Sequence, residues 1–294
     1  MRFMGENSLR LSIDHRKQGF RIRRGKLTHF VVFVVALFTA LPILANGSDS
    51  KKVRCGEQSL KRAIDKARPG STIVVIGSCS DGPYLIEKDL RLVGGKDAEL
   101  LTHLQVDGAT VRVENLKIIG DGMGVGRGGR LIADQVEIRD AFIGIGVLDL
   151  SILEIRNSLI ANSSNLGIWA VGRAMLLVDS TRIENSGVGI YLESTSSARV
   201  YSTTIRNGIG GIDIGRFSEV ETFNVTIEDN EGTGILLSDK YSYIFMEDQS
   251  IIQNNGLDLR CGDRAIVEVV ETNVSATGTT EIDPGCTLLG NPIF

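Results

Sequence analysis

A pair made of glycine and a large apolar residue recurs along this chain at an almost constant interval. The pairs are Gly144-Ile145, Gly167-Ile168, Gly189-Ile190, Gly211-Ile212, Gly234-Ile235 and Gly256-Leu257, and successive pairs are 23, 22, 22, 23 and 22 residues apart. Spacing this regular arises when one short structural unit is stacked on copies of itself. The repeat therefore predicts a solenoid before any local propensity is considered.

A second series of residues keeps the same interval. Its members are isoleucines followed two residues later by Asp or Asn, namely Ile138 and Asp140, Ile160 and Asn162, Ile183 and Asn185, Ile205 and Asn207, and Ile227 and Asp229. Asp and Asn tolerate left-handed backbone angles and suit a sharp corner. A third apolar alternation, such as Leu176 and Val178, lies between the two series. Three short strands in about 22 residues predict one coil of a parallel β-solenoid.

The segment before the regular repeats predicts a cap. Gln58–Ala67 places Leu60, Ala63 and Ile64 on one helical face, and Arg68-Pro69-Gly70 ends the pattern. A short amphipathic helix here would cover the open end of the solenoid, which otherwise exposes core and unpaired strand edges. A predicted strand over residues 72–76 and a Gly94-Gly95 corner follow.

This entry segment resembles that of right-handed parallel β-helix proteins of the pectin-lyase-like superfamily. The Ile-x-Asn and Gly-Ile repeats are similar to that family's coils, and the resemblance spans roughly residues 53 to 275. It implies an all-β fold, a single-stranded right-handed parallel β-helix of roughly 22-residue coils with a short N-terminal capping helix. It implies no single activity, because the superfamily includes lyases, hydrolases, esterases, epimerases and non-catalytic surface proteins.

The first 45 residues have a different composition from the rest. Basic residues from Arg16 to Lys26 precede an apolar run that starts at Phe30 and ends at Ala45. We predict an export signal over residues 1–45 and a β-helix domain over residues 53–290. The run is shorter than the roughly 20 residues of a bilayer span, so cleavage and a secreted or periplasmic protein are favoured. The alternative is a membrane anchor made by a retained N-terminal segment.

Net charge narrows the choice of partners. Without residues 1–45 the chain has 24 Lys and Arg against 34 Asp and Glu. Such an acidic balance argues against nucleic acid and anionic lipid as partners.

The four cysteines all follow the predicted signal. Cys55 and Cys79 bracket the predicted cap, and Cys261 and Cys286 bracket the last coil. Of the three possible pairings we favour neighbours at each end, because these bonds would hold together the places where a solenoid frays. A metal site is disfavoured, since no cysteine pair has CxxC spacing and His103 is the only histidine after residue 45. No metal and no cofactor are expected.

Stacking also predicts which side chains share an exposed face. If the apolar residue of each pair points inward, the next residue points outward and lines up with its counterparts about 4.8 Å away in neighbouring coils. This column reads Gly146, Trp169, Tyr191, Asp213, Leu236 and Asp258, and the column two residues on reads Leu148, Val171, Glu193, Gly215, Ser238 and Arg260. Exposed rings beside carboxylates are typical of sugar-binding surfaces. We therefore predict ligand binding by Trp169, Tyr191, Asp258 and Arg260; the alternative is an aromatic pair that stabilises the sheet.

Catalytic residues are harder to assign. Glu193 and Asp213 would lie about 8 Å apart on the diagonal, within the range for inverting glycoside hydrolysis, although solvated surface carboxylates have the same spacing. His103 is predicted to be a core or loop histidine. The glycine-rich residues 123–130 are predicted to form a loop. The catalytic signatures of polygalacturonases, pectate lyases and alginate epimerases have no counterpart, so the resemblance assigns no catalytic residue.

Two functions remain open from the sequence. The first is an exported β-helix protein that binds or processes polysaccharide through an exposed parallel sheet. The second is a non-catalytic structural or adhesive surface protein.

Overall fold

The computed structural model describes residues 49–247, 249–270, 275–276 and 278–290. The chain divides into residues 1–46 and 47–294, and the description concerns the second unit. The predicted export signal over residues 1–45 lies outside the described residues.

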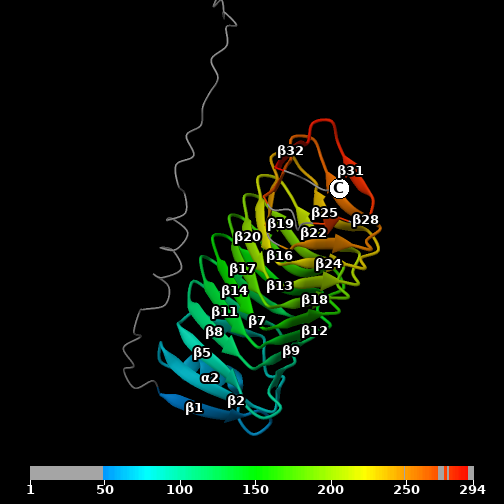
Figure 1. Ribbon diagram of the computed structural model, residues 1–294. Coiled ribbons are helices and arrows are strands. Elements are labelled where there is room, and N and C mark those ends of the chain that lie inside the picture. The colour runs from blue at the N-terminus through cyan, green and yellow to red at the C-terminus, as the bar shows by residue number, and fades with distance from the viewer. Residues whose placement is uncertain (1–48, 248, 271–274, 277, 291–294) are drawn as a thin grey trace, which may run out of the picture. The chain divides into compact units, whose positions relative to one another are not determined.

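Three parallel sheets wind around one core, and each strand pairs with its counterpart one coil away (Figure 1). Sheet A has the order β1 (Ser50–Arg54), β2 (Ser71–Ile76), β5 (Leu90–Gly94), β8 (Thr110–Glu114), β11 (Arg130–Asp134), β14 (Ile152–Arg156), β17 (Met175–Asp179), β20 (Ser197–Tyr201), β23 (Glu219–Phe223), β26 (Tyr243–Glu247), β29 (Ile266–Val269) and β32 (Thr287–Gly290). Sheet B has the order β3 (Ser78–Cys79), β6 (Glu99–Leu100), β9 (Lys117–Ile119), β12 (Glu137–Arg139), β15 (Leu159–Ala161), β18 (Arg182–Glu184), β21 (Thr204–Arg206), β24 (Thr226–Glu228), β27 (Ile251–Gln253) and β30 (Ser275–Ala276). Sheet C has the order β4 (Tyr84–Ile86), β7 (Leu104–Asp107), β10 (Met123–Gly126), β13 (Ile143–Leu148), β16 (Leu166–Val171), β19 (Val188–Glu193), β22 (Gly210–Ile214), β25 (Thr233–Leu237), β28 (Leu257–Cys261) and β31 (Thr280–Ile282). The predicted β-solenoid is confirmed.

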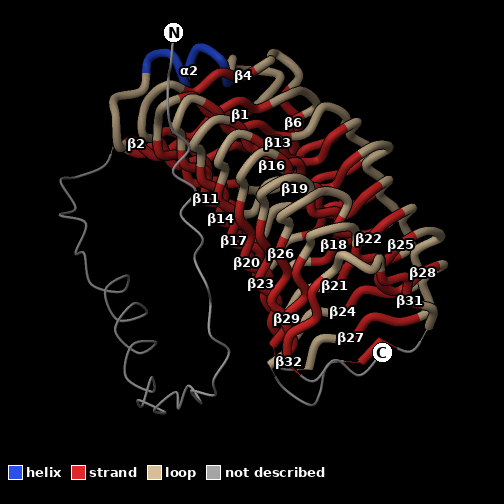
Figure 2. Tube along the Cα trace, turned by 90° about the horizontal axis from the view of Figure 1, so that it is seen from above, coloured by secondary structure: helices blue, strands red, loops and turns tan. Residues whose placement is uncertain are grey.

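The predicted cap is confirmed as helix α2 (Leu60–Lys66), which lies at one end of the coils (Figure 2). Ser59 begins the helix, and its hydroxyl accepts a hydrogen bond from the backbone N–H of Arg62. Leu60, Ala63 and Ile64 are buried against the core. At seven residues, α2 falls far short of a membrane span, and no other helix in the described part of the chain is long and apolar enough to cross a bilayer.

The isoleucine series forms a continuous inner column of sheet B. Ile160 pairs with Ile183, both side chains are fully buried, and the same pairing runs from Ile138 to Ile227. The Asp or Asn two residues after each isoleucine has a left-handed backbone, with φ between 54° and 58°. Amides link successive corners, as in the 3.0 Å bond from Asn162 Nδ2 to Asp140 Oδ1. The predicted corners are confirmed.

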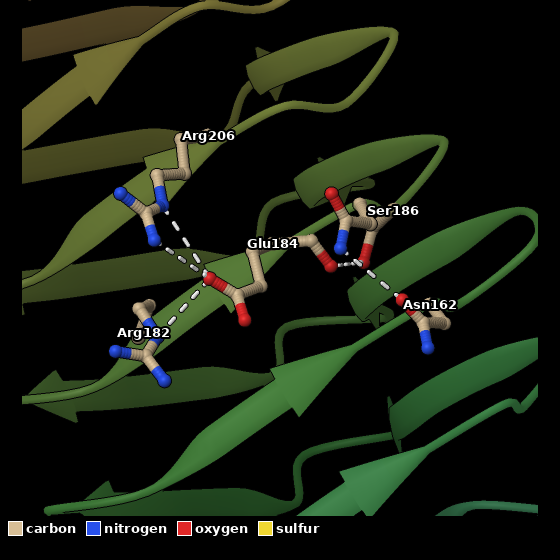
Figure 3. A network of polar contacts seen from close by, with 6 residues as sticks. Asn162, Arg182, Glu184, Ser186 and Arg206 are labelled. Atoms are coloured by element: carbon tan, nitrogen blue, oxygen red, sulfur yellow. Dashed lines mark hydrogen bonds and ion pairs between the residues drawn. The ribbon is translucent and has the colours of Figure 1, made fainter.

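Charged side chains on the outer face of sheet B pair with opposite charges (Figure 3). Glu184 lies 3.2 Å from a guanidinium nitrogen of Arg206, its partner one coil later, and 3.1 Å from one of Arg182 on its own strand. Stacked like charges about 4.8 Å apart would repel one another, so the pairing of opposite charges stabilises this face.

Both predicted disulfides are present. Cys55 bonds to Cys79 beside the cap, and Cys261 bonds to Cys286 in the last coils.

The sixth glycine pair, Gly256-Leu257, was assigned to the wrong register. Leu259 pairs with Ile235, 24 residues earlier, so Leu259 rather than Leu257 points into the core. The turn from sheet C to sheet A and the turn from sheet A to sheet B are each one residue longer in this coil than in the coil before. Asp258 therefore takes the inward position that glycine occupies in the earlier coils.

The loop predicted over residues 123–130 is also wrong in part. Met123–Gly126 forms β10 in sheet C, and Gly124 and Gly126 pair in register with Gln105 and Asp107. The Gln105 side chain lies over them: a Cβ added to Gly124 would meet Gln105 Oε1, the end of a flexible side chain, at 2.1 Å.

Candidate functional site

The outer face of sheet C and the turns beside it collect apolar side chains that remain in solvent. Of the thirteen large hydrophobic residues exposed in the described part of the chain, seven lie here: Leu85, Leu101, Phe142, Leu150, Ile209, Phe217 and Tyr241. Six of the seven lie in the turns at the two edges of sheet C, and Leu85 alone lies on one of its strands. We call this surface the sheet C face.

The predicted aromatic pair lies at the centre of the sheet C face. Trp169 pairs directly with Tyr191, which confirms that both rings lie on one sheet, and Tyr191 pairs in turn with Asp213. Leu166 and Val188 flank the rings and are half-buried. Trp169 Nε1 is buried and has no hydrogen-bond partner within the described residues. A buried donor of this kind normally finds a partner, so Trp169 Nε1 is an exception among the buried polar groups of the protein.

An open slot lies beside Trp169. The strand before it carries Gly146, and a Cβ placed there would meet no atom within 4 Å. On the far side of the slot, the Gln105 amide covers Gly124. The amide and the indole thus stand two strands apart, about 10 Å from each other. Any residue other than glycine at position 146 would place a side chain on the floor of this slot.

A polar network that the sequence analysis did not identify closes the slot. His103 Nδ1 lies 3.0 Å from the Asp121 carbonyl oxygen, and Nε2 lies 3.1 Å from Gln105 Oε1. Gln105 Nε2 donates to Asp107 Oδ1 at 2.7 Å, and Arg127 Nε lies 3.5 Å from Asp107 Oδ2. His103 lies in the loop directly before β7, in agreement with the loop alternative of the sequence analysis, and it is part of an ordered surface network. The alternation of His103, Gln105 and Asp107 is the sequence signal that would have placed all three on one strand face.

The carboxylates lie on the opposite side of the aromatic pair. Burial raises the pKa of Asp213, a bond donated by the Ser238 hydroxyl at 2.7 Å partly opposes this, and the charge of Asp239 raises it further. Burial and the charges of Glu193, Asp213 and Asp239 also raise the pKa of Tyr191. These three carboxylates therefore act together to disfavour ionisation of the Tyr191 hydroxyl.

The other two residues of the predicted site, Asp258 and Arg260, differ in where their side chains lie. Asp258 does not lie on the sheet C face: its side chain is fully buried and accepts bonds from Asn255 and from the backbone N–H of Gly278. The shifted register of that coil is the reason. Arg260 does point outward, but it pairs with Leu236 rather than Ser238, and its Nε lies 3.4 Å from Glu281.

Other places on the molecule fit a ligand less well. An open cleft of about 670 Å³ lies where sheet A turns into sheet B, between polar corner residues such as Gln135, Asn157 and Ser180. No aromatic residue lines it. Within the described ranges, no three His, Cys, Asp or Glu side chains are grouped to hold a metal ion.

Several solved structures have a similar backbone. The periplasmic alginate epimerase AlgG matches with 12% identity and a TM-score of 0.46, over 82% of this chain and 84% of that one. Pectate lyase Pel9A matches with 12% identity and a TM-score of 0.49, over 81% and 79% of the two chains. An alginate lyase from Paenibacillus sp. matches with 14% identity and a TM-score of 0.35, over 82% and 98%. Identity this low concerns the fold and not the activity.

No curated protein matches this chain in sequence. The family model described as the right handed beta helix region matches residues 102–268, more than half of the chain and most of its regular coils. The parallel sheets and the coil length agree with that match. The chain therefore belongs to the right-handed β-helix family.

Proposed function

We propose that this protein binds a polysaccharide chain on the sheet C face. The observation that carries the proposal is the Trp169 ring, which is only half-buried and stands beside Tyr191 and an open slot. The apolar face of a sugar ring packs on an aromatic ring, and its hydroxyls need polar partners at the edge. The sheet C face supplies an aromatic stacking surface and polar partners within a few strands of each other.

The two sides of the aromatic pair supply different polar partners. On one side, the network of His103, Gln105 and Asp107 offers amide and imidazole groups. On the other side, Asp213 and Glu193 offer carboxylate oxygens that accept bonds from sugar hydroxyls. Fixed polar groups around an apolar stacking surface favour a sugar over a purely apolar ligand.

Hydrolysis of the bound chain is a second candidate function, favoured by one observation. The raised pKa of Asp213 is a property of a general acid, and Glu193 is the neighbouring carboxylate that would act as base. In this role Asp213 would donate a proton to the glycosidic oxygen while Glu193 activates water. Shortening of the bound polysaccharide, lost in D213N but with binding retained, would support it.

The location of this activity is also part of the proposal. Two disulfides hold the ends of the stack. Such bonds persist in oxidising compartments, which supports a protein that acts outside the cytoplasm.

The test compares two aromatic pairs of the same protein. A glycan array identifies the polysaccharide that the parent retains, and titration calorimetry with that polysaccharide then compares W169A and Y191A with the parent. Each substitution is expected to weaken binding about tenfold or more, equivalent to about 1.4 kcal/mol. The matched control is Y201A with F223A, because these rings also form a pair, 6.2 Å apart, but lie on sheet A.

The result that contradicts the proposal is equally specific. If W169A and Y191A fold like the parent and retain every polysaccharide that the parent retains, the sheet C face is not the binding surface. Equal losses in the control pair would contradict it too, because they would point to a general effect of removing exposed rings.

A further inference from the structure

We infer that Phe217 and Tyr241, at the turn from sheet C to sheet A, form a second subsite on which the same polysaccharide chain stacks. This inference rests on the proposed function and adds to it a direction for the bound chain. The two residues belong to successive coils, in the turns after β22 and β25.

The rings form a shelf that is open to solvent. Phe217 is 52% exposed and Tyr241 is 51% exposed. Their centroids are 5.4 Å apart and their planes differ by 4°. Parallel rings at this separation are offset-stacked, and the pair joins two successive coils, which repeat about every 4.8 Å.

The repeat sets the backbone of this turn position. Phe217 has φ of 57° and Tyr241 has φ of 63°, and the equivalent residues Arg173, Thr195 and Arg264 also have positive φ, between 62° and 67°. The left-handed backbone therefore belongs to this turn in successive coils. Phe217 and Tyr241 differ from the other residues at this position in carrying rings, and half of each ring remains in solvent.

The residues on the two sides of the pair along the stack differ. On the far side, Arg264 Nη1 donates to Tyr241 Oη, at the edge of the ring, at 3.3 Å. On the near side, the same turn position of the preceding coil is Thr195, a short and exposed residue. Because Thr195 carries no ring, the aromatic stack ends at Phe217. A flat sugar ring would continue that stack with its apolar face on Phe217.

Phe217 is close to the sheet C face along the chain. Glu193 ends β19 only two residues before Thr195, and Gly215 directly follows β22. Gly215 is buried, and a Cβ there would lie 2.9 Å from the Leu192 carbonyl oxygen, so the glycine lets the two coils approach closely beside Glu193. Glu193 thus lies between the Tyr191 ring and the Phe217 ring and can accept hydroxyl hydrogen bonds along the way.

These positions define a diagonal path. Trp169 and Phe217 are two coils apart, or about 10 Å along the stack, and Phe217 lies about four residues further along its coil, at most ~13 Å. A single sugar ring cannot span that separation. A chain of several sugars would lie on Trp169 at one end and on Phe217 at the other, crossing the strands obliquely.

The test uses ligand length as its readout. F217G and Y241N remove the rings and suit the left-handed backbone, so both variants are expected to fold at least as well as the parent. Disaccharides and octasaccharides of glucose, mannuronate and galacturonate homopolymers serve as probes. In F217G, octasaccharide affinity is expected to fall about five- to tenfold, while disaccharide affinity stays unchanged. F223A on sheet A is the matched control, a 37% exposed ring away from the path.

The results for W169A and F217G together test the proposed function and the second subsite. Loss of octasaccharide binding in both W169A and F217G supports the diagonal path. Loss of octasaccharide binding in W169A alone keeps the proposed function and overturns the second subsite. The second subsite is also overturned if F217G changes only the self-association of the protein. No loss in either variant overturns both.

Discussion

Single glycines determine how closely successive coils approach. At Gly189, an added Cβ would lie 2.4 Å from Ile205 Cγ2 and 2.7 Å from the Gly211 carbonyl oxygen. The first atom belongs to a stiff, fully packed side chain and the second to the backbone, so neither can move aside cheaply. The glycine series is therefore a packing requirement of the solenoid.

Substitution of Gly189 tests this requirement. We expect G189A to lower the free energy of unfolding by about 1–3 kcal/mol, the usual cost of overpacking a core. The midpoint of urea unfolding measures it. G146A is the matched control, because the same methyl group on the same sheet meets no atom within 4 Å. Equal effects of the two substitutions would mean that backbone entropy, and not the close approach of coils, explains the glycines.

Asp213 predicts a dependence of stability on pH. Burial, with the nearby charge of Asp239, raises its pKa in the folded protein, so the ionised side chain opposes folding. When the pKa of an acid is raised in the folded protein, its contribution to stability is fully present below the unfolded-state pKa. That contribution is lost as the pH rises through the folded-state pKa. D213N removes the charge and keeps an oxygen for the Ser238 hydroxyl. We expect D213N to be more stable than the parent at pH 7 and equal to it below the ordinary Asp pKa.

A specific result of the pH comparison would contradict this prediction. Thermal unfolding of parent and D213N at a series of pH values gives the difference directly. If D213N is less stable than the parent at neutral pH, the carboxylate is stabilised by partners on the sheet C face, and its assignment as a general acid fails with it.

At the scale of strands and turns, prediction succeeded where the information lies within one repeat. The inward isoleucines and the Asn or Asp corners follow from local spacing and turn chemistry, and both are found as expected. The register beyond Gly234 failed because it depends on turn lengths, and Gly256 happens to fall where a regular repeat would put it. Period alone cannot detect a longer turn.

The polar network beside the slot shows a second limit. Gln105 bonds to His103 and Asp107, and its amide lies over Gly124 and Gly126, a coil later. In sequence, this glycine cluster suggests a loop, and nothing nearby in the sequence links it to the histidine. Recognising the network requires knowing which residues of adjacent coils face each other, which is a property of the assembled sheet.

For the stack as a whole, stability is the sum of contacts between neighbouring coils, and the two ends differ. At the first end, α2 buries Leu60 and Ile64 over the core. At the other end, all four residues of β32 are exposed, including the large apolar residues Leu288 and Leu289. The Cys261–Cys286 bond holds these last coils, closing a segment of 25 residues. Removing it is therefore expected to act locally.

We expect C261A/C286A to unfold from its C-terminal coils. A loop of this length loses about 3 kcal/mol of stabilisation in the chain-entropy account when its bond is removed. Hydrogen exchange read by mass spectrometry should speed up in β28 to β32 and stay unchanged in β13 to β19, which carry Trp169 and Tyr191. C55A/C79A is the matched control, because α2 still covers that end. Faster exchange throughout the sheets would show that the coils unfold as one unit, and the sheet C face would then depend on a bond several coils away.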